Sequence, residues 1–153
     1  MSNENERRIE EIMSKHVVTL NADSSAFDAA TKMSSKNISS LVLIDSGKIV
    51  GILTERDLIK QICAKDLLSS KAPVTSIMSS PIITINKDLL VKEAAITMIK
   101  NRMRHIAVEN NAHEIIGMVS STDLTRFLID RLEDPSDNLS LLRSLYWQEE
   151  PIE

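Results

Sequence analysis

The chain repeats itself once, and this repeat limits the possible folds more than any other feature of the sequence. When the sequence is shifted by 65 residues, Ile12–Ser14 lies over Ile77–Ser79. After one inserted residue, Gly51 lies over Gly117. The chain contains only three glycines, so two at equivalent positions are strong evidence for a genuine repeat. Two such units predict a pseudo-symmetric pair that shares one core.

Each unit has the pattern of a strand, a helix, two further strands and a second helix. The expected strands are Val17–Leu20, Ser40–Ile44 and Ile49–Leu53, followed in the second unit by Ile82–Ile85, Ile106–Val108 and Ile115–Val119. The second helix of each unit is expected to begin at Thr54 and at Ser120. The strands are apolar at nearly every residue, as in sheets that are covered on both faces. The sequence therefore predicts an α+β fold of two small sheets, packed together and flanked by helices.

The first helix of each unit has candidate N-caps in its acidic and hydroxyl residues. Asp23 or Ser24 is expected to cap the first of these helices, and Asp88 the equivalent helix of the second unit. Phe27 falls on the apolar face of the first helix. The only cysteine, Cys63, follows an apolar helical pattern and is expected to be buried.

A short signature closes each unit and carries a resemblance to a known family. Gly51–Leu58 has a glycine, an apolar pair, a Thr, two variable residues and an Asp, and Gly117–Leu124 repeats this order with Ser for Thr. With the upstream segments Ile77–Pro81 and Ile38–Asp45, the pattern resembles the tandem CBS motif over roughly residues 9 to 130. The division this predicts is a polar segment at 1–8, the first motif at 9–66, a linker at 67–76, the second motif at 77–130 and a tail at 131–153.

The resemblance implies a function as well as a fold. CBS pairs hold two clefts related by a pseudo-twofold axis and bind adenosine-containing ligands. AMP, ADP and ATP are the first expectation here, and S-adenosylmethionine is a further one. The resemblance also implies a homodimer, and an unidentified effector protein as partner.

Asp57 and Asp123 are the first candidate site residues. In the family this aspartate accepts hydrogen bonds from the two ribose hydroxyls, a task that suits an acceptor-only carboxylate. Thr54 and Ser120 lie three residues earlier and join them as ribose-binding candidates. The same spacing also forms a capping box, so capping alone could explain both pairs. The two roles are compatible.

Arg104 and His105 are the first candidates for contact with phosphate. They begin the middle strand of the second unit, where the family places phosphate-binding residues, and Arg offers a planar donor fork. The alternative is a solvated strand end. The remaining phosphate-binding candidates are Arg56, Thr122, Ser39 and Ser40. Ser39 and Ser40 are neutral, so the two clefts are expected to differ in chemistry.

The adenine pocket is expected to come from backbone and apolar groups. Its candidates are Val17, Val18, Thr19, Ile38, Ile82, Ile83, Thr84 and Met103. The alternative is a place in the ordinary core, and this interpretation holds for most of these residues.

Composition argues against several other classes of protein. The formal net charge of −4 disfavours a DNA or RNA partner. No apolar run reaches the roughly 18 residues of a membrane span, and the polar start is unlike a secretion signal, so a cytoplasmic protein is expected. One cysteine and no recognised ligand spacing predict no metal site.

We find no nucleophile elbow, no phosphate loop and no His-Glu-x-x-His, so the sequence predicts no enzyme and no obligatory cofactor. The tail has apolar residues at helical spacing, including Leu139, Leu142 and Trp147, which predicts a short amphipathic helix. The function expected from the sequence is a regulatory sensor of adenosine nucleotides. The alternative is a ligand-free homodimeric scaffold.

Overall fold

The computed structural model describes residues 7–130, which form two compact units. One unit is the continuous stretch Val17–Ile83. The other combines residues 7–16 with residues 84–130. The predicted amphipathic tail helix lies outside the described residues.

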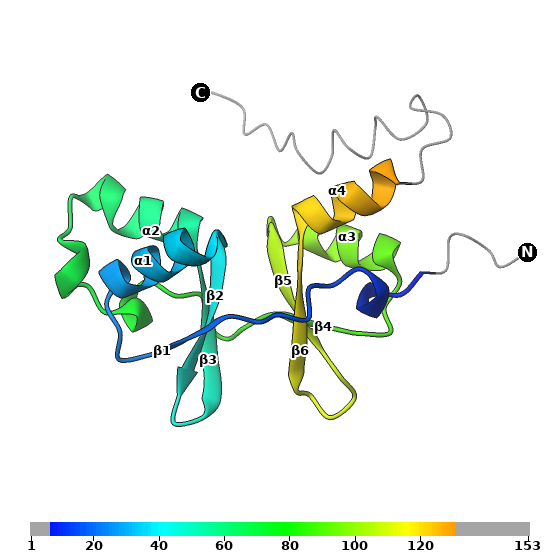
Figure 1. The fold of residues 1–153 in the computed structure, drawn as a ribbon, viewed down its shortest axis with the longest axis horizontal. Coiled ribbons are helices and arrows are strands. Elements are labelled where there is room, and N and C mark those ends of the chain that lie inside the picture. Colours follow the sequence, from blue (N-terminus) through cyan, green and yellow to red (C-terminus); the bar gives the residue numbers. More distant parts are fainter. Residues whose placement is uncertain (1–6, 131–153) are drawn as a thin grey trace, which may run out of the picture. The chain divides into compact units, whose positions relative to one another are not determined.

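The unit Val17–Ile83 is built on a three-stranded sheet in the order β1-β2-β3 (Figure 1). Its regular elements are β1 (Thr19–Asn21), α1 (Ala26–Lys36), β2 (Ser40–Asp45), β3 (Lys48–Thr54) and α2 (Glu55–Gln61). β1 and β2 are parallel, whereas β2 and β3 form an antiparallel hairpin. Three short 3₁₀ turns follow, at Cys63–Lys65, Ser69–Lys71 and Val74–Ser76.

The other unit repeats this topology with the order β4-β5-β6. Its elements are a 3₁₀ turn at Ile9–Glu11, β4 (Thr84–Asn86), α3 (Val91–Lys100), β5 (His105–Glu109), β6 (Ile115–Ser120) and α4 (Ser121–Ile129). Even the register irregularity recurs, between Leu43 and Ile44 in β2 and between Val108 and Glu109 in β5. The predicted α+β class and the order of elements are confirmed.

Aliphatic side chains from the strands and helices of each unit form its core, as the low aromatic content requires. Leu41, Leu43 and Leu53 are fully buried in the first core together with Ala29 of α1. The second core uses matching residues, which include Ile106, Val108, Val119 and Leu124.

The two repeats exchange their opening segments. Ile12–Ser14, which opens the first repeat in sequence, packs in the unit with β4, β5 and β6, and Ile77–Ser79, which opens the second, packs in the unit with β1, β2 and β3. Ser14 exchanges two backbone hydrogen bonds of 2.9 Å with Met118 of β6. Likewise, Ser79 donates to and accepts from the backbone of Ile52 in β3, at 2.9 and 3.0 Å. Ile9 is fully buried in the second-repeat core, although it precedes the first repeat in sequence.

This exchange explains the repeated glycines. A Cβ at Gly117 would lie 2.9 Å from the carbonyl oxygen of Ser14 and 2.5 Å from the sulfur of Met13. A Cβ at Gly51 would lie 2.8 Å from the carbonyl oxygen of Ser79. Real Cβ atoms do not approach backbone oxygen so closely, so both positions need glycine for the close approach of a neighbouring segment.

Some local predictions were wrong. Ser25 caps α1, in place of Asp23 or Ser24, because its hydroxyl accepts from the backbone N–H of Asp28 at 3.1 Å. Asp88 does not cap α3, whose N-cap residue is Leu90.

The first strand of each repeat also begins later than predicted, at Thr19 and at Thr84. The structure also contradicts the predicted burial of Phe27 and Cys63. Phe27 of α1 is 55% exposed, and Cys63, which begins a 3₁₀ turn after α2, is exposed.

Candidate functional site

Each unit brings the start of its middle strand, the end of its last strand and the start of its second helix to one corner. In the first repeat, Ser40 of β2 pairs with Thr54 at the end of β3. In the second repeat, His105 of β5 pairs with Ser120 at the end of β6. We call these places the first-repeat corner and the second-repeat corner. The first comprises Ser39, Ser40, Thr54, Glu55 and Asp57, and the second comprises Arg104, His105, Ser120, Ser121 and Asp123.

A backbone hydrogen bond closes each corner in the same way. The N–H of Glu55 donates to the carbonyl oxygen of Ser39 at 3.1 Å. The N–H of Ser121 donates to the carbonyl oxygen of Arg104 at 2.9 Å. The bond ties the first residue of the helix to the residue before the middle strand. It thus brings the predicted ribose and phosphate candidates of one repeat together.

The predicted capping boxes are present in both repeats. In the first-repeat corner, Oδ2 of Asp57 accepts from the backbone N–H and the hydroxyl of Thr54, both at 2.8 Å. The Thr54 hydroxyl in turn accepts from the N–H of Asp57 at 3.3 Å. Oδ1 of Asp57 accepts no hydrogen bond from any described residue, so this oxygen remains an acceptor for a ligand.

The second-repeat corner has the same box with one addition. Oδ2 of Asp123 accepts from the N–H of Ser120 at 2.8 Å and from its hydroxyl at 2.7 Å. Nη1 of Arg126 lies 4.0 Å from Oδ1 of Asp123. The Arg126 side chain is 70% exposed, so this ion pair is loose and screened by water.

The phosphate candidates divide between the corners. Arg104 is exposed and His105 is half-buried in the second-repeat corner, where Thr122 follows the first residue of α4. The equivalent positions of the first-repeat corner hold Ser39, Ser40 and Arg56. The expected chemical difference between the repeats is therefore present at structurally equivalent places.

The adenine candidates fall into two groups. β1 is parallel to β2, and the N–H of Val42 donates to the carbonyl oxygen of Val18 at 3.1 Å. The start of β1, with Val17, Val18 and Thr19, therefore lies at the same end of the sheet as the start of β2. Thr84 holds the matching place in the second repeat, paired with Ala107 of β5.

Ile82 and Ile83 belong by their contacts to the unit Val17–Ile83, so the structure does not bring them into one unit with Thr84. Ile38 and Met103 are half-buried, and each packs against the core of its own unit.

Thr84 has a hydrogen-bonding role that the sequence did not reveal. Its hydroxyl donates to Oε2 of Glu109 at 2.9 Å, and Nδ1 of His113 lies 3.0 Å from Oε1. These contacts favour the ionised carboxylate, so the hydrogen bond with His113 and then that with Thr84 lower the pKa of Glu109. The hydroxyl of Thr84 therefore links β4 to the end of β5.

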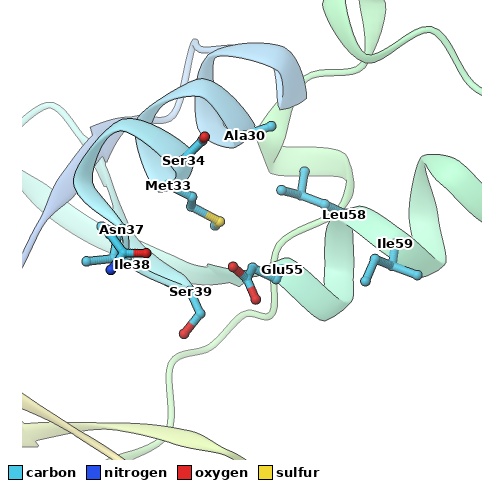
Figure 2. Close-up of a pocket in the computed structure, with 9 residues that line it drawn as sticks. All are labelled: Ala30, Met33, Ser34, Asn37, Ile38, Ser39, Glu55, Leu58 and Ile59. Atoms are coloured by element: carbon cyan, nitrogen blue, oxygen red, sulfur yellow. The ribbon is translucent and has the colours of Figure 1, made fainter.

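A pocket of about 670 Å³ opens between α1 and α2, within the size range of small-molecule sites. Figure 2 shows its side chains, which come from the facing helices and from the residues that lead into β2. The lining residues are Ala30, Met33, Ser34, Asn37, Ile38, Ser39, Glu55, Leu58 and Ile59. It adjoins the first-repeat corner at Ser39 and Glu55, and Glu55 is the single charged residue in its lining.

Sequence reasoning identified Ile38 and Ser39 in this lining but missed the rest. Asn37 offered a signal, because Asn after a helical pattern often ends a helix in the left-handed conformation, as it does here with φ of 51°. Glu55 offered none, because an acidic residue in the first turn of a helix is ordinary.

Within residues 7–130, no group of three or more His, Cys, Asp or Glu side chains is placed to hold a metal ion. None of the helices in this part of the chain is long and apolar enough to cross a membrane.

Comparison with known proteins agrees with this architecture. An uncharacterized 17.7 kDa protein of Acidianus ambivalens is 32% identical over 124 residues, which are 80% of this chain and 74% of that protein. L-aspartate semialdehyde sulfurtransferase of Methanocaldococcus jannaschii is also 32% identical, over 119 residues. The match covers 77% of this chain but only 22% of that much longer enzyme.

Two solved structures extend the comparison. The CBS domain pair of protein MJ0100, in complex with 5′-methylthioadenosine and S-adenosyl-L-methionine, has a TM-score of 0.73 and 30% identity, and covers 81% of this chain and 97% of that one. A hexameric CBS-CP12 protein from bloom-forming cyanobacteria has a TM-score of 0.73 and 25% identity, over 78% of this chain and 66% of that one.

The family model of the CBS domain matches the sequence twice in tandem, at residues 9–64 and 74–130. These two matches span most of the chain, and they coincide with the two repeats of strand, helix, strand, strand and helix. The chain belongs to the CBS domain family.

Proposed function

We propose that the protein is a regulatory module that binds an adenosine-type ligand at its repeat corners and acts on a partner protein. The observation that carries this proposal is the half-used carboxylate in each repeat. Asp57 and Asp123 each use Oδ2 for the helix cap, which fixes the side chain, and among residues 7–130 Oδ1 of each accepts no hydrogen bond. Oδ1 of Asp123 has only the loose ion pair with the exposed Arg126. A fixed acceptor with one open oxygen is suited to a ribose hydroxyl.

The hydroxyls of Thr54 and Ser120 are better suited to positioning than to direct contact. Each already donates to an aspartate and accepts from a backbone N–H. We therefore assign ribose contact to Asp57 and Asp123, and we assign to Thr54 and Ser120 the task of holding those carboxylates.

Phosphate contact is assigned first to Arg104 and His105. Arg104 is exposed beside the start of α4, and its guanidinium can form two parallel hydrogen bonds with a phosphate. His105 pairs with Ser120 in the same corner and is the second candidate for phosphate contact. The backbone at the starts of β1 and β4, with Ile38 and Met103 as apolar walls, remains the proposed adenine site.

The complex of MJ0100 with two adenosine compounds supports this class of ligand. It supports S-adenosylmethionine, which the sequence already suggested beside AMP, ADP and ATP, and it adds methylthioadenosine to the candidates. We further propose that the protein forms homodimers in the cytoplasm, and that it needs no nucleic acid or membrane for its action. The hexameric relative supports self-association in general.

A ligand-free scaffold is the second candidate function. It is favoured by the packing of Met103 and Ile38 against the cores of their own units, because walls that belong to the core leave less room for a base. In that case the corners would stabilise the fold only, through the capping boxes.

Thermal unfolding separates the two functions. The protein would be heated with AMP, ADP, ATP, S-adenosylmethionine, methylthioadenosine or GMP. A ligand at about 100 times its dissociation constant adds roughly 2.7 kcal/mol of stability, which raises the melting temperature by several degrees. A shift with an adenosine compound and none with GMP supports the sensor. No shift with any compound at millimolar concentration, in a sample that melts cooperatively, supports the scaffold.

A further inference from the structure

The two corners have the same backbone hydrogen bonding but differ in charge. Two pairs of equivalent residues form the backbone hydrogen bond that closes each corner. The carbonyl oxygen that accepts this bond belongs to Ser39 in the first repeat and to Arg104 in the second. The N–H that donates belongs to Glu55 in the first repeat and to Ser121 in the second. A neutral and an acidic residue in one repeat thus correspond to a basic and a neutral residue in the other.

The charges of the neighbouring residues reinforce this difference. Asn37 and Arg102 are equivalent positions that lead into the middle strands, and Arg56 and Thr122 are equivalent positions in the second helices. With these included, the first-repeat corner holds one arginine against the carboxylates of Glu55 and Asp57. In the second-repeat corner Arg104 is the basic residue, Arg102 lies two positions before it, and among the corner residues named above only Asp123 is acidic.

The pocket between α1 and α2 has the charge of the first-repeat corner. Its lining combines aliphatic residues with the neutral polar side chains of Ser34, Asn37 and Ser39. Glu55 supplies its one carboxylate, and no lysine or arginine belongs to the lining (Figure 2). A phosphate placed there would meet a negative charge and no cation, which is an arrangement that rejects a ligand rather than binding it.

We infer that the two repeats select adenosine ligands by opposite charge at the 5′ position. The second-repeat corner takes a phosphorylated ligand, because Arg104 offers a charge-assisted pair of hydrogen bonds. The first-repeat corner takes a phosphate-free adenosine compound whose 5′ group is neutral or cationic, because Glu55 repels phosphate and attracts an ammonium or sulfonium group. This inference rests on the proposed function and adds the chemical class that each corner accepts.

Titration calorimetry with a reciprocal exchange of residues tests the inference. AMP serves as the anionic probe, methylthioadenosine as the neutral probe and S-adenosylmethionine as the cationic probe. Arg104→Ser gives the second-repeat corner the residue of the first, and Ser39→Arg together with Glu55→Ser does the reverse. Lys92→Ser removes a positive charge from the opposite end of α3 and is the matched control.

The wild-type protein is expected to bind AMP and methylthioadenosine together, without competition. Arg104→Ser should weaken AMP at least about tenfold and leave methylthioadenosine unchanged, since one lost charge-assisted hydrogen bond has an effect of this size. The double variant should gain a second AMP site and lose S-adenosylmethionine. Lys92→Ser should bind all three compounds as the wild type does.

Three results would overturn the inference. The first is competition between AMP and methylthioadenosine for one site with equal stoichiometry. The second is an equal loss of affinity for both compounds in Arg104→Ser. The third is a loss of AMP affinity in Lys92→Ser as large as that in Arg104→Ser. Each of these results leaves adenosine binding intact and contradicts only the selection of ligands by charge. If the folded wild-type protein binds none of the three compounds, the proposed function itself is wrong, and the selection of ligands by charge is wrong with it.

Discussion

Asp57 and Asp123 show how one side chain can serve both the fold and a ligand. Each caps a helix through Oδ2 and has no described hydrogen bond at Oδ1. Capping and ligand binding were alternatives as long as only the spacing of the residues was known. Since the two tasks use different oxygens of one carboxylate, a substitution that changes only one oxygen can separate them.

Asp123→Asn is such a substitution. The amide oxygen of Asn can still accept from the N–H and hydroxyl of Ser120, so the free energy of unfolding should fall by less than about 1 kcal/mol. The amide nitrogen then replaces Oδ1 and cannot accept from a ribose hydroxyl. Ligand affinity should therefore fall at least about tenfold, for the loss of one hydrogen bond to a charged group. Urea unfolding and calorimetry measure the two effects.

Asp28→Asn is the matched control for this prediction. Asp28 forms the same box with Ser25, whose N–H and hydroxyl lie 2.9 and 2.8 Å from Oδ2, but it has no proposed ligand contact. It should lose similar stability and bind ligand normally. If Asp28→Asn weakens binding as much as Asp123→Asn does, the effect is structural and the ribose assignment is wrong.

At the scale of elements, the hairpin of β5 and β6 differs from that of β2 and β3 in its ionisable contacts. Glu109 at the end of β5 accepts from Thr84 of β4 and contacts His113 in the turn, and its side chain is 19% exposed. The equivalent position in β2 is Ile44, which pairs with Asn21 as Glu109 pairs with Asn86. Only the second-repeat hairpin therefore gains stability from an ionised carboxylate at this place.

The stability of this hairpin should depend on pH in the acid range. The hydrogen bonds with His113 and Thr84 lower the pKa of Glu109 in the folded protein. A group of this kind stabilises the fold above its unfolded pKa, near 4.3 for Glu, and the stabilisation is lost as the pH falls through the lower folded pKa. The stability difference between the wild type and Glu109→Gln should therefore be full well above the unfolded pKa and should shrink as the pH falls below it.

Urea unfolding at several pH values measures this difference. Thr84→Val removes one of the two donors, so it should reduce the same pH dependence without abolishing it. A constant difference between the wild type and Glu109→Gln over this range would show that the ionised form of Glu109 contributes nothing.

The elements also show what could be predicted from the sequence. Runs of apolar residues predicted β2, β3, β5 and β6 to within one residue, because these strands are buried and their pattern is local. The capping residue of α1 was missed although Ser25 and Asp28 stand three residues apart, because Asp23 and Ser24 are also of residue types that commonly cap helices. Exposure of Phe27 and Cys63 could not be read from a helical pattern, because it depends on what covers the helix.

At the scale of the whole molecule, the repeat in sequence is not the repeat in packing. The sequence alignment places Ile12–Ser14 at the start of the first repeat, yet this segment pairs with β6 of the second. Ile77–Ser79 does the reverse with β3. A sequence pattern states which segments are alike, but it does not state which sheet edge each one joins. That choice is made by long-range contacts, such as the close approach that Gly51 and Gly117 permit.

The exchange predicts that the N-terminal segment stabilises the second repeat. Ile9 is fully buried in the core that contains Ile106, Val119 and Leu124, so Ile9→Ala should lower the free energy of unfolding by about 2–5 kcal/mol. Amide hydrogen exchange should show the loss of protection in β4, β5 and β6, because local stability follows the contacts that a segment makes. The sheet of β1, β2 and β3 should keep its protection.

Ile83→Ala is the control, because Ile83 is 44% exposed and its truncation leaves no cavity. It should change stability by no more than about 0.5 kcal/mol, as surface substitutions commonly do. If Ile9→Ala instead exposes β1, β2 and β3 to exchange, the opening segment supports the repeat that follows it in sequence. The exchange of segments would then be wrong, and with it the reason why both repeats keep a glycine in their last strand.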